Sequence, residues 1–82
     1  MVSKDYRDLL VWQKAMDLVE EIYSLTEDFP DQEIFGLTQQ IKRAAISIPS
    51  NIAEGQGQSS KKAFNRFLII AQGSLNELET QL

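Results

Sequence analysis

A proline inside an apolar helical pattern constrains the fold of this chain more than any other feature. Between Arg43 and Gly55, isoleucines and alanines recur at helical spacing, and Pro49 stands among them. A proline in a helix interior removes one amide donor, and its ring presses on the carbonyl group one turn earlier, here near Ala45. Because the apolar phase continues on both sides of Pro49, we predict a single helix over residues 32–54 that is kinked at this proline.

Two further segments carry apolar rows with the period of a helix. The first is predicted as a helix over residues 9–27, where two adjacent rows form a wide apolar stripe. The members of these rows are Val11, Ala15, Leu18, Ile22 and Leu25, and Trp12, Met16, Val19, Tyr23 and Thr26. The other is predicted over residues 60–82, with an apolar row at Phe64, Leu68, Ala71, Leu75, Leu78 and Leu82. No convincing strand pattern is found, so the predicted fold class is all-α, an antiparallel up-and-down helical bundle.

The predicted helices begin at residues suited to capping. Asp8 is the expected N-cap of the first helix, and Asp31 suits the start of the second, where negative charge meets the positive end of the helix dipole. Ser59 or Ser60 is expected to cap the third helix. Pro30 ends the first segment, with Phe29 expected to fold back as an apolar plug.

Three glycines carry separate predictions. Gly55 and Gly57 are expected to stop the second helix and form a short turn. Gly73 lies inside the third helix, where glycine costs about 1 kcal/mol relative to alanine. We expect close approach of a neighbouring backbone to compensate that cost.

The composition indicates one domain, residues 1–82, near the lower size limit for a single apolar core. The absence of cysteine fits a reducing compartment, and the first eight residues contain no apolar signal region. The longest apolar run, Phe67–Ala71, is too short to cross a bilayer. We therefore expect a soluble cytoplasmic protein with no membrane partner.

Catalysis finds little support in the residue types present. The chain has no histidine and no cysteine, so the commonest general bases, nucleophiles and soft metal ligands are missing. The Glu-x-x-His pairs of di-metal helical bundles cannot be formed. The turn at Gly55–Gly57 lacks the length and the lysine of a P-loop. We expect no enzyme, no cofactor and no metal, and an enzyme would need an unforeseen site around Arg43 and Glu54.

Basic residues gather in the middle of an otherwise acidic chain with net charge −4. The candidates for contact with nucleic acid or another anion are Lys42, Arg43, Lys61, Lys62 and Arg66. A charge row of this size is more often a solvated face, and that interpretation is favoured. Cations in the first turns of the third helix oppose the helix dipole, however, so local stability does not explain them and contact with an anion is indicated there.

A polar row follows one side of the second helix. Its members are Gln40, Arg43, Ser47, Asn51 and Glu54, with Ser50 beside Asn51. We favour a hydrogen-bonded seam between helices, or a subunit contact, over a ligand site, because buried polar groups usually satisfy one another. Ser47 is expected to bond back to the Arg43 carbonyl, and Asn51 to satisfy groups freed by Pro49.

The apolar row of the third helix is still running at Leu82, with no terminating glycine or proline. This indicates either a fragment or a chain that completes its core through a partner. The three helices are then expected to leave an apolar groove that something else covers.

The chain resembles the 23S ribosomal RNA intervening-sequence proteins, a four-helix-bundle family. The matching blocks cover nearly the whole chain in the expected order: Leu10–Ala15, Phe29–Pro30, Gly36–Thr38, Gln40, Arg43–Gly55, Phe67–Leu68, Ile70–Ala71 and Gly73–Leu78. The resemblance implies an up-and-down bundle, with a fourth helix that this chain lacks, so a truncated four-helix bundle is expected. The family has no established biochemical function. The related accessory proteins of diversity-generating retroelements form ring-shaped homo-pentamers thought to bind nucleic acid.

Two functional hypotheses follow. The favoured one is a non-enzymatic helical bundle that self-associates, with a pentameric ring implied by the resemblance. The alternative is an accessory protein that binds RNA or DNA, although position 58, where relatives often carry a basic residue, is Gln58 here.

Overall fold

The protein is helical throughout the part that its computed structural model describes, residues 5–28, 35–58 and 60–82. The elements are η1 (Tyr6–Asp8), α1 (Leu10–Thr26), α2 (Phe35–Gln56) and α3 (Lys61–Gln81). No strand occurs in these ranges. The predicted all-α class with three long helices is confirmed. None of the helices in the described ranges is both long and apolar enough to cross a membrane.

Helix α2 runs without interruption through Pro49, as the apolar phase predicted. The predicted helix start at residue 32, the Asp31 cap and the Phe29 plug lie outside the described residues. The prediction that Gly55 stops this helix is wrong, since α2 includes Gly55, but the helix does end at Gln56, directly before Gly57. No glycine in the described segments has a positive φ, so the turn is made without the left-handed conformation that would require glycine.

Gly55 has a packing role in place of the predicted terminating role. It is buried, and a Cβ atom added there would lie 2.7 Å from Cβ of Phe67 and 2.9 Å from Cδ1 of Phe64. The glycine therefore lets the end of α2 lie against the first turns of α3. The opposite holds for Gly73, where no heavy atom lies within 4 Å of an added Cβ. The predicted close backbone approach at Gly73 is wrong within the described chain.

The start of α1 also differs from the prediction. Asp8 belongs to η1, and Leu9 precedes α1 in an extended conformation without a side-chain cap. Asp5 caps η1, because its carboxylate accepts a hydrogen bond from the Arg7 amide at 2.9 Å and pairs with the Arg7 guanidinium at 2.8 Å. The hydrogen bond from the guanidinium also holds the pKa of the Asp5 carboxyl below its usual range. This local pairing forms an additional 3₁₀ turn and shifts Asp8 away from the cap position.

Helix α3 is capped by Ser60, one of the two predicted cap residues. The hydroxyl of Ser60 accepts a hydrogen bond from the Ala63 amide at 3.1 Å, which satisfies one free donor of the first turn. Both α1 and α3 are one residue shorter at each end than predicted. Differences of this size are ordinary at helix ends, where the last turns fray.

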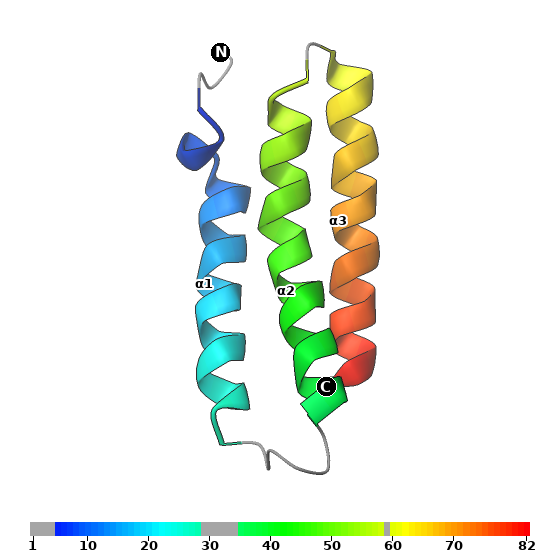
Figure 1. The fold of residues 1–82 in the computed structure, drawn as a ribbon. Coiled ribbons are helices and arrows are strands. Elements are labelled where there is room, and N and C mark those ends of the chain that lie inside the picture. Colours follow the sequence, from blue (N-terminus) through cyan, green and yellow to red (C-terminus); the bar gives the residue numbers. More distant parts are fainter. Residues whose placement is uncertain (1–4, 29–34, 59) are drawn as a thin grey trace.

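Helix α2 lies between α1 and α3 (Figure 1). In the described residues, no Cα atom of α1 comes within 8 Å of one in α3, so α2 is the only long helix on which each outer helix packs. The core is accordingly built around α2. Its buried apolar members are Ala15 and Ile22 from α1, Ile41, Ala44, Ala45, Ile48 and Ile52 from α2, and Ala71 and Leu78 from α3.

Candidate interaction surfaces

The polar row predicted on α2 is divided between partnered and exposed residues. The hydroxyl groups of Ser47 and Ser74 lie 2.6 Å apart and join α2 to α3 by a hydrogen bond. The Gln81 amide nitrogen donates to Oε1 of Gln40 at 3.4 Å, a second and longer link between the same helices. Asn51 completes this set, because its Nδ2 donates to Oγ of Ser47 at 3.0 Å.

Two details of the predicted row are corrected. The Ser47 hydroxyl was expected to bond to the Arg43 carbonyl, but it is engaged by Ser74 and Asn51. Asn51 was expected to satisfy a group freed by Pro49, but its Nδ2 donates to the Ser47 carbonyl at 2.8 Å. A proline at position 49 frees the Ala45 carbonyl, since the missing amide would have bonded four residues back. The Asn51 side chain therefore reinforces the helical turn that follows the missing backbone hydrogen bond.

Arg43 and Glu54, the remaining members of the row, are both exposed. Eleven residues separate them on α2, about 16 Å along the axis at 1.5 Å per residue. Neither side chain has a hydrogen bond or ion pair to another described residue. The two side chains therefore do not contact each other.

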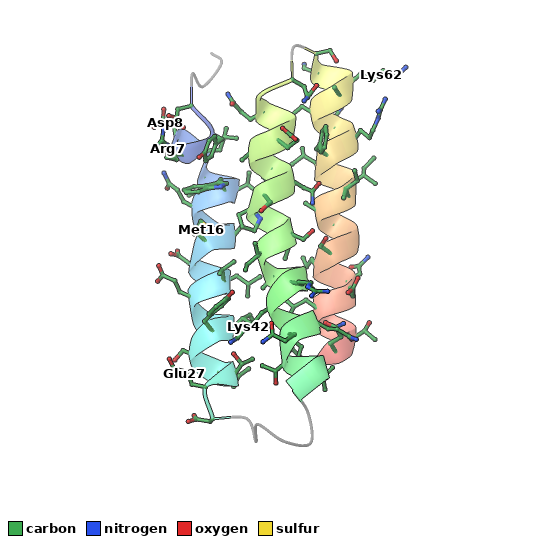
Figure 2. The ribbon with its side chains drawn as sticks, in the orientation of Figure 1. Arg7, Asp8, Met16, Glu27, Lys42 and Lys62 are labelled. Atoms are coloured by element: carbon green, nitrogen blue, oxygen red, sulfur yellow. The ribbon has the colours of Figure 1, made fainter. Side chains whose placement is uncertain are left out.

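The basic candidates lie in two separate places. The Lys42 ammonium lies 4.9 Å from the centre of the Tyr23 ring, between α2 and α1, and Arg43 is next to it in sequence. Lys61, Lys62 and Arg66 are all exposed in the first two turns of α3. Figure 2 shows Lys42 and Lys62 towards opposite ends of the molecule.

The hydrogen bond between Gln81 and Gln40 shows how far Lys42 and Arg43 lie from the basic residues of α3. It places the start of α2, where Lys42 lies, beside the end of α3. From Lys62 to Gln81 the helix rises about 28 Å at 1.5 Å per residue. The sequence suggested one basic patch, but the fold places Lys42 and Arg43 far from the other three residues.

An open apolar pocket of about 260 Å³ lies between α1 and α2, and sequence analysis did not predict it. It is lined by Tyr6, Trp12, Met16, Val19, Ile46, Pro49, Ser50 and Ala53. The Tyr6 and Trp12 rings meet edge to face at 5.2 Å between centroids and form its wall near η1. The second apolar row of α1 could have indicated this pocket, because α2 covers that row only in part.

Apolar side chains also remain exposed on α1 and α3. Val11, Leu18 and Leu25 recur every seven residues along α1, and Leu68, Leu75 and Leu82 do the same along α3. We call these the α1 row and the α3 row. Leu18, Leu68 and Leu75 pack in part against the core, whereas Val11, Leu25 and Leu82 are exposed by 47%, 49% and 59%.

Acidic residues do not converge in the described chain: no group of three potential ligands could hold a metal ion there. Fold and surface together define a small all-α protein with exposed apolar and basic regions. A family model described as 23S rRNA-intervening sequence protein matches residues 7–82. The chain belongs to this family. A search of curated proteins found no match.

Proposed function

We propose that this protein is a non-enzymatic helical bundle that self-associates, with a second copy covering the α1 row and the α3 row. The observation that carries the proposal is that the outer helices flank α2 without contacting each other, while Val11, Leu25 and Leu82 stay exposed. Burying apolar surface is the main driving force of protein association. Exposed apolar side chains arranged in rows are more indicative of a contact than scattered ones.

An antiparallel order of the helices is part of the proposal. Lys42, near the start of α2, lies over Tyr23, near the end of α1. Gly55, near the end of α2, packs on Phe64 and Phe67, near the start of α3. These pairings support an up-and-down arrangement in which α1 and α3 run in the same direction.

The two rows are matched in height. Tyr23 and Gln81 flank the same end of α2, through Lys42 and Gln40 respectively, and this places Leu25 and Leu82 at similar heights. Because each row repeats every seven residues, the other members are matched as well. Successive residues of a helix are rotated by about 100° around its axis. When this rotation is followed from the residues that pack on α2, and α1 and α3 run in the same direction, the α1 row and the α3 row lie on one face of the molecule. A second copy could therefore cover both rows at once, as the missing side of a four-helix bundle would.

Self-association is tested by light scattering after size exclusion at micromolar concentration. We expect the unaltered chain to form a defined homo-oligomer. Leu25→Lys combined with Leu82→Lys should lower the mass, because charged side chains replace apolar ones at the contact. The helical circular dichroism signal should remain, because both side chains are exposed already.

The matched control carries the same added charge at neighbouring positions. Ser24→Lys combined with Thr80→Lys, both at exposed positions, should keep the original mass. A well-folded monomeric wild-type chain would contradict the proposal.

Nucleic-acid binding is the second candidate, and the cluster on α3 favours it. Lys61, Lys62 and Arg66 are exposed together, and none forms an ion pair with a described residue. Three cations on one short helical surface could neutralise neighbouring phosphates and release their counterions. An anionic partner would also explain cations that oppose the helix dipole.

Charge reversal at this cluster tests the second candidate. Lys62→Glu should weaken binding of a structured RNA in gel retardation at low salt and make the salt dependence shallower. Lys14→Glu, at an exposed position on α1, is the matched control and should change binding less. Absence of retardation for the wild-type chain at low salt would exclude this function.

A further inference from the structure

The pocket between α1 and α2 uses none of the residues that the proposed self-association uses. Its lining includes no residue of the α1 row and no described residue of α3. All of its described walls come from one chain, namely from η1, α1 and α2. A ligand for this pocket can therefore be considered apart from the oligomeric state.

The volume of the pocket limits the size of a ligand. At about 260 Å³ it is larger than an engineered apolar cavity of about 150 Å³ that admits benzene. It is smaller than the pockets of about 300–1,000 Å³ that hold drug-sized molecules. A compound of two fused rings lies between these limits. Because the pocket is open, such a compound can enter without separating α1 from α2.

The lining favours an aromatic ligand. The Tyr6 and Trp12 rings meet edge to face, with 5.2 Å between centroids and 68° between planes. A further ring placed beside them continues this packing, because aromatic rings prefer edge-to-face or offset-stacked contacts. Met16 lines the pocket from α1, and its thioether sulfur also packs well on aromatic rings. Ile46, on the α2 side, is 42% exposed and would lose contact with water under such a ligand.

The absence of charge in the described lining favours a neutral ligand. A charged ligand would lose its hydration there without gaining an ionic partner, and that loss is costly. A cation is opposed at the Tyr6 ring for a second reason. The Arg7 guanidinium already lies 5.4 Å from the centre of that ring, where it is paired with the Asp5 carboxylate at 2.8 Å.

Two hydroxyl groups give the apolar pocket its hydrogen-bonding capacity. Tyr6 contributes one from η1, and Ser50 contributes the other from α2. Neither hydroxyl has a hydrogen bond to another described residue. A hydroxyl oxygen accepts a hydrogen bond from an N–H group. A ring that packs on Tyr6 and Trp12 would direct its other edge towards α2, where Ser50 is the polar residue of the lining.

We propose that this pocket binds a neutral aromatic heterocycle of two fused rings that carries one N–H group, with indole as the simplest example. The ring system packs against Tyr6 and Trp12, and its N–H group donates to the hydroxyl of Ser50. The proposal adds a small-molecule site to the proposed function and does not depend on it, because the pocket is formed within one chain.

Titration of isotope-labelled protein with unlabelled indole, followed by NMR, tests the proposal. Trp12 is the one tryptophan of the chain, so its side-chain N–H signal reports on the wall of the pocket. We expect this signal and the amide signals of Ile46 and Ala53 to shift and to saturate. Benzofuran has the same shape without the N–H group, and it should bind about two- to tenfold more weakly. The indoleacetate anion should also bind more weakly than indole.

Substitutions at Ser50 separate the hydrogen bond from the packing. Ser50→Ala should weaken indole binding about two- to tenfold and leave benzofuran binding unchanged. Ser50→Phe adds a ring at the wall of the pocket and should abolish saturable binding of both compounds. Ser24→Ala and Ser24→Phe are the matched controls, because Ser24 is also exposed but does not line the pocket. Circular dichroism checks that each variant keeps the wild-type helical signal.

The outcomes separate this inference from the proposed function. No saturable shift of the Trp12 signal would overturn the inference, and so would equal affinities for indole, benzofuran and indoleacetate. An indole affinity that falls as the protein concentration rises would overturn it as well, because a neighbouring copy would then occupy the pocket. A monomeric chain that binds indole as described would support this inference and contradict the proposed function.

Discussion

Replacement of Leu78 with alanine is expected to lower the free energy of unfolding by about 2–5 kcal/mol. Leu78 is 1% exposed and is the largest fully buried side chain that α3 contributes to the core. Its loss removes apolar contacts and leaves a cavity against α2. Because small domains have a total stability of only about 5–15 kcal/mol, the variant should unfold at a clearly lower urea concentration than the wild-type chain. Urea denaturation followed by circular dichroism measures the change.

Ile70→Ala is the control on the same helix. Ile70 is 45% exposed, so the same kind of truncation removes less buried surface and should cost on the order of 1 kcal/mol or less. Similar losses for Leu78→Ala and Ile70→Ala would mean that α3 does not pack on α2 through the face described above.

Alanine at Gly55 is expected to destabilise the protein by about 1–3 kcal/mol through overpacking. The new methyl group would lie 2.7 Å from Cβ of Phe67, an atom next to the backbone that cannot move without shifting α3. Alanine gains about 1 kcal/mol of helix propensity over glycine, but this gain does not offset a contact of that kind. Thermal unfolding should therefore occur at a lower temperature than in the wild-type chain.

Gly73→Ala is the matched substitution, and its effect should have the opposite sign. Gly73 is exposed within α3 and has no heavy atom within 4 Å of the added Cβ. Only the helix propensity changes, so the variant should gain up to about 1 kcal/mol of stability. If both alanine variants were stabilised, the close packing of Gly55 on Phe67 would be incorrect.

The three helices could be predicted because their signals are local. The apolar phase on both sides of Pro49 predicted that α2 would pass through the proline, and it does. Ser59 or Ser60 was predicted as a cap from its place before an apolar row, and the Ser60 hydroxyl accepts a hydrogen bond from the Ala63 amide. Periodicity and capping depend on residues within one or two turns, so a single sequence contains the necessary information.

The errors concern residues whose role depends on distant neighbours or on a competing local contact. Gly55 and Gly73 look alike in sequence, yet one lies against Phe67 and the other faces open space. Asp8 was a reasonable cap, but Arg7 pairs with Asp5 and organises a different turn. Residue spacing alone could not distinguish these cases. The deciding contact is made either with a residue on another helix, as for Gly55, or between near neighbours that form a different turn, as beside Asp8.

For the candidate surfaces too, the residues could be predicted from the sequence but their contacts could not. The polar row could be listed from the sequence, but its link through Ser47 depends on Ser74, twenty-seven residues further along the chain. The basic residues could also be listed from the sequence, while their separation into two places depends on how α2 lies against α3.

Local signals were enough to predict the helical class, the course of α2 through Pro49 and the apolar faces, because these depend on backbone geometry and on neighbours a few residues away. The tertiary structure was needed to show that α2 separates α1 from α3, that Gly55 is a packing site, and that Leu10 and Ile69 are left exposed. Such features arise from contacts between residues far apart in the chain, whose partners a helical period does not specify.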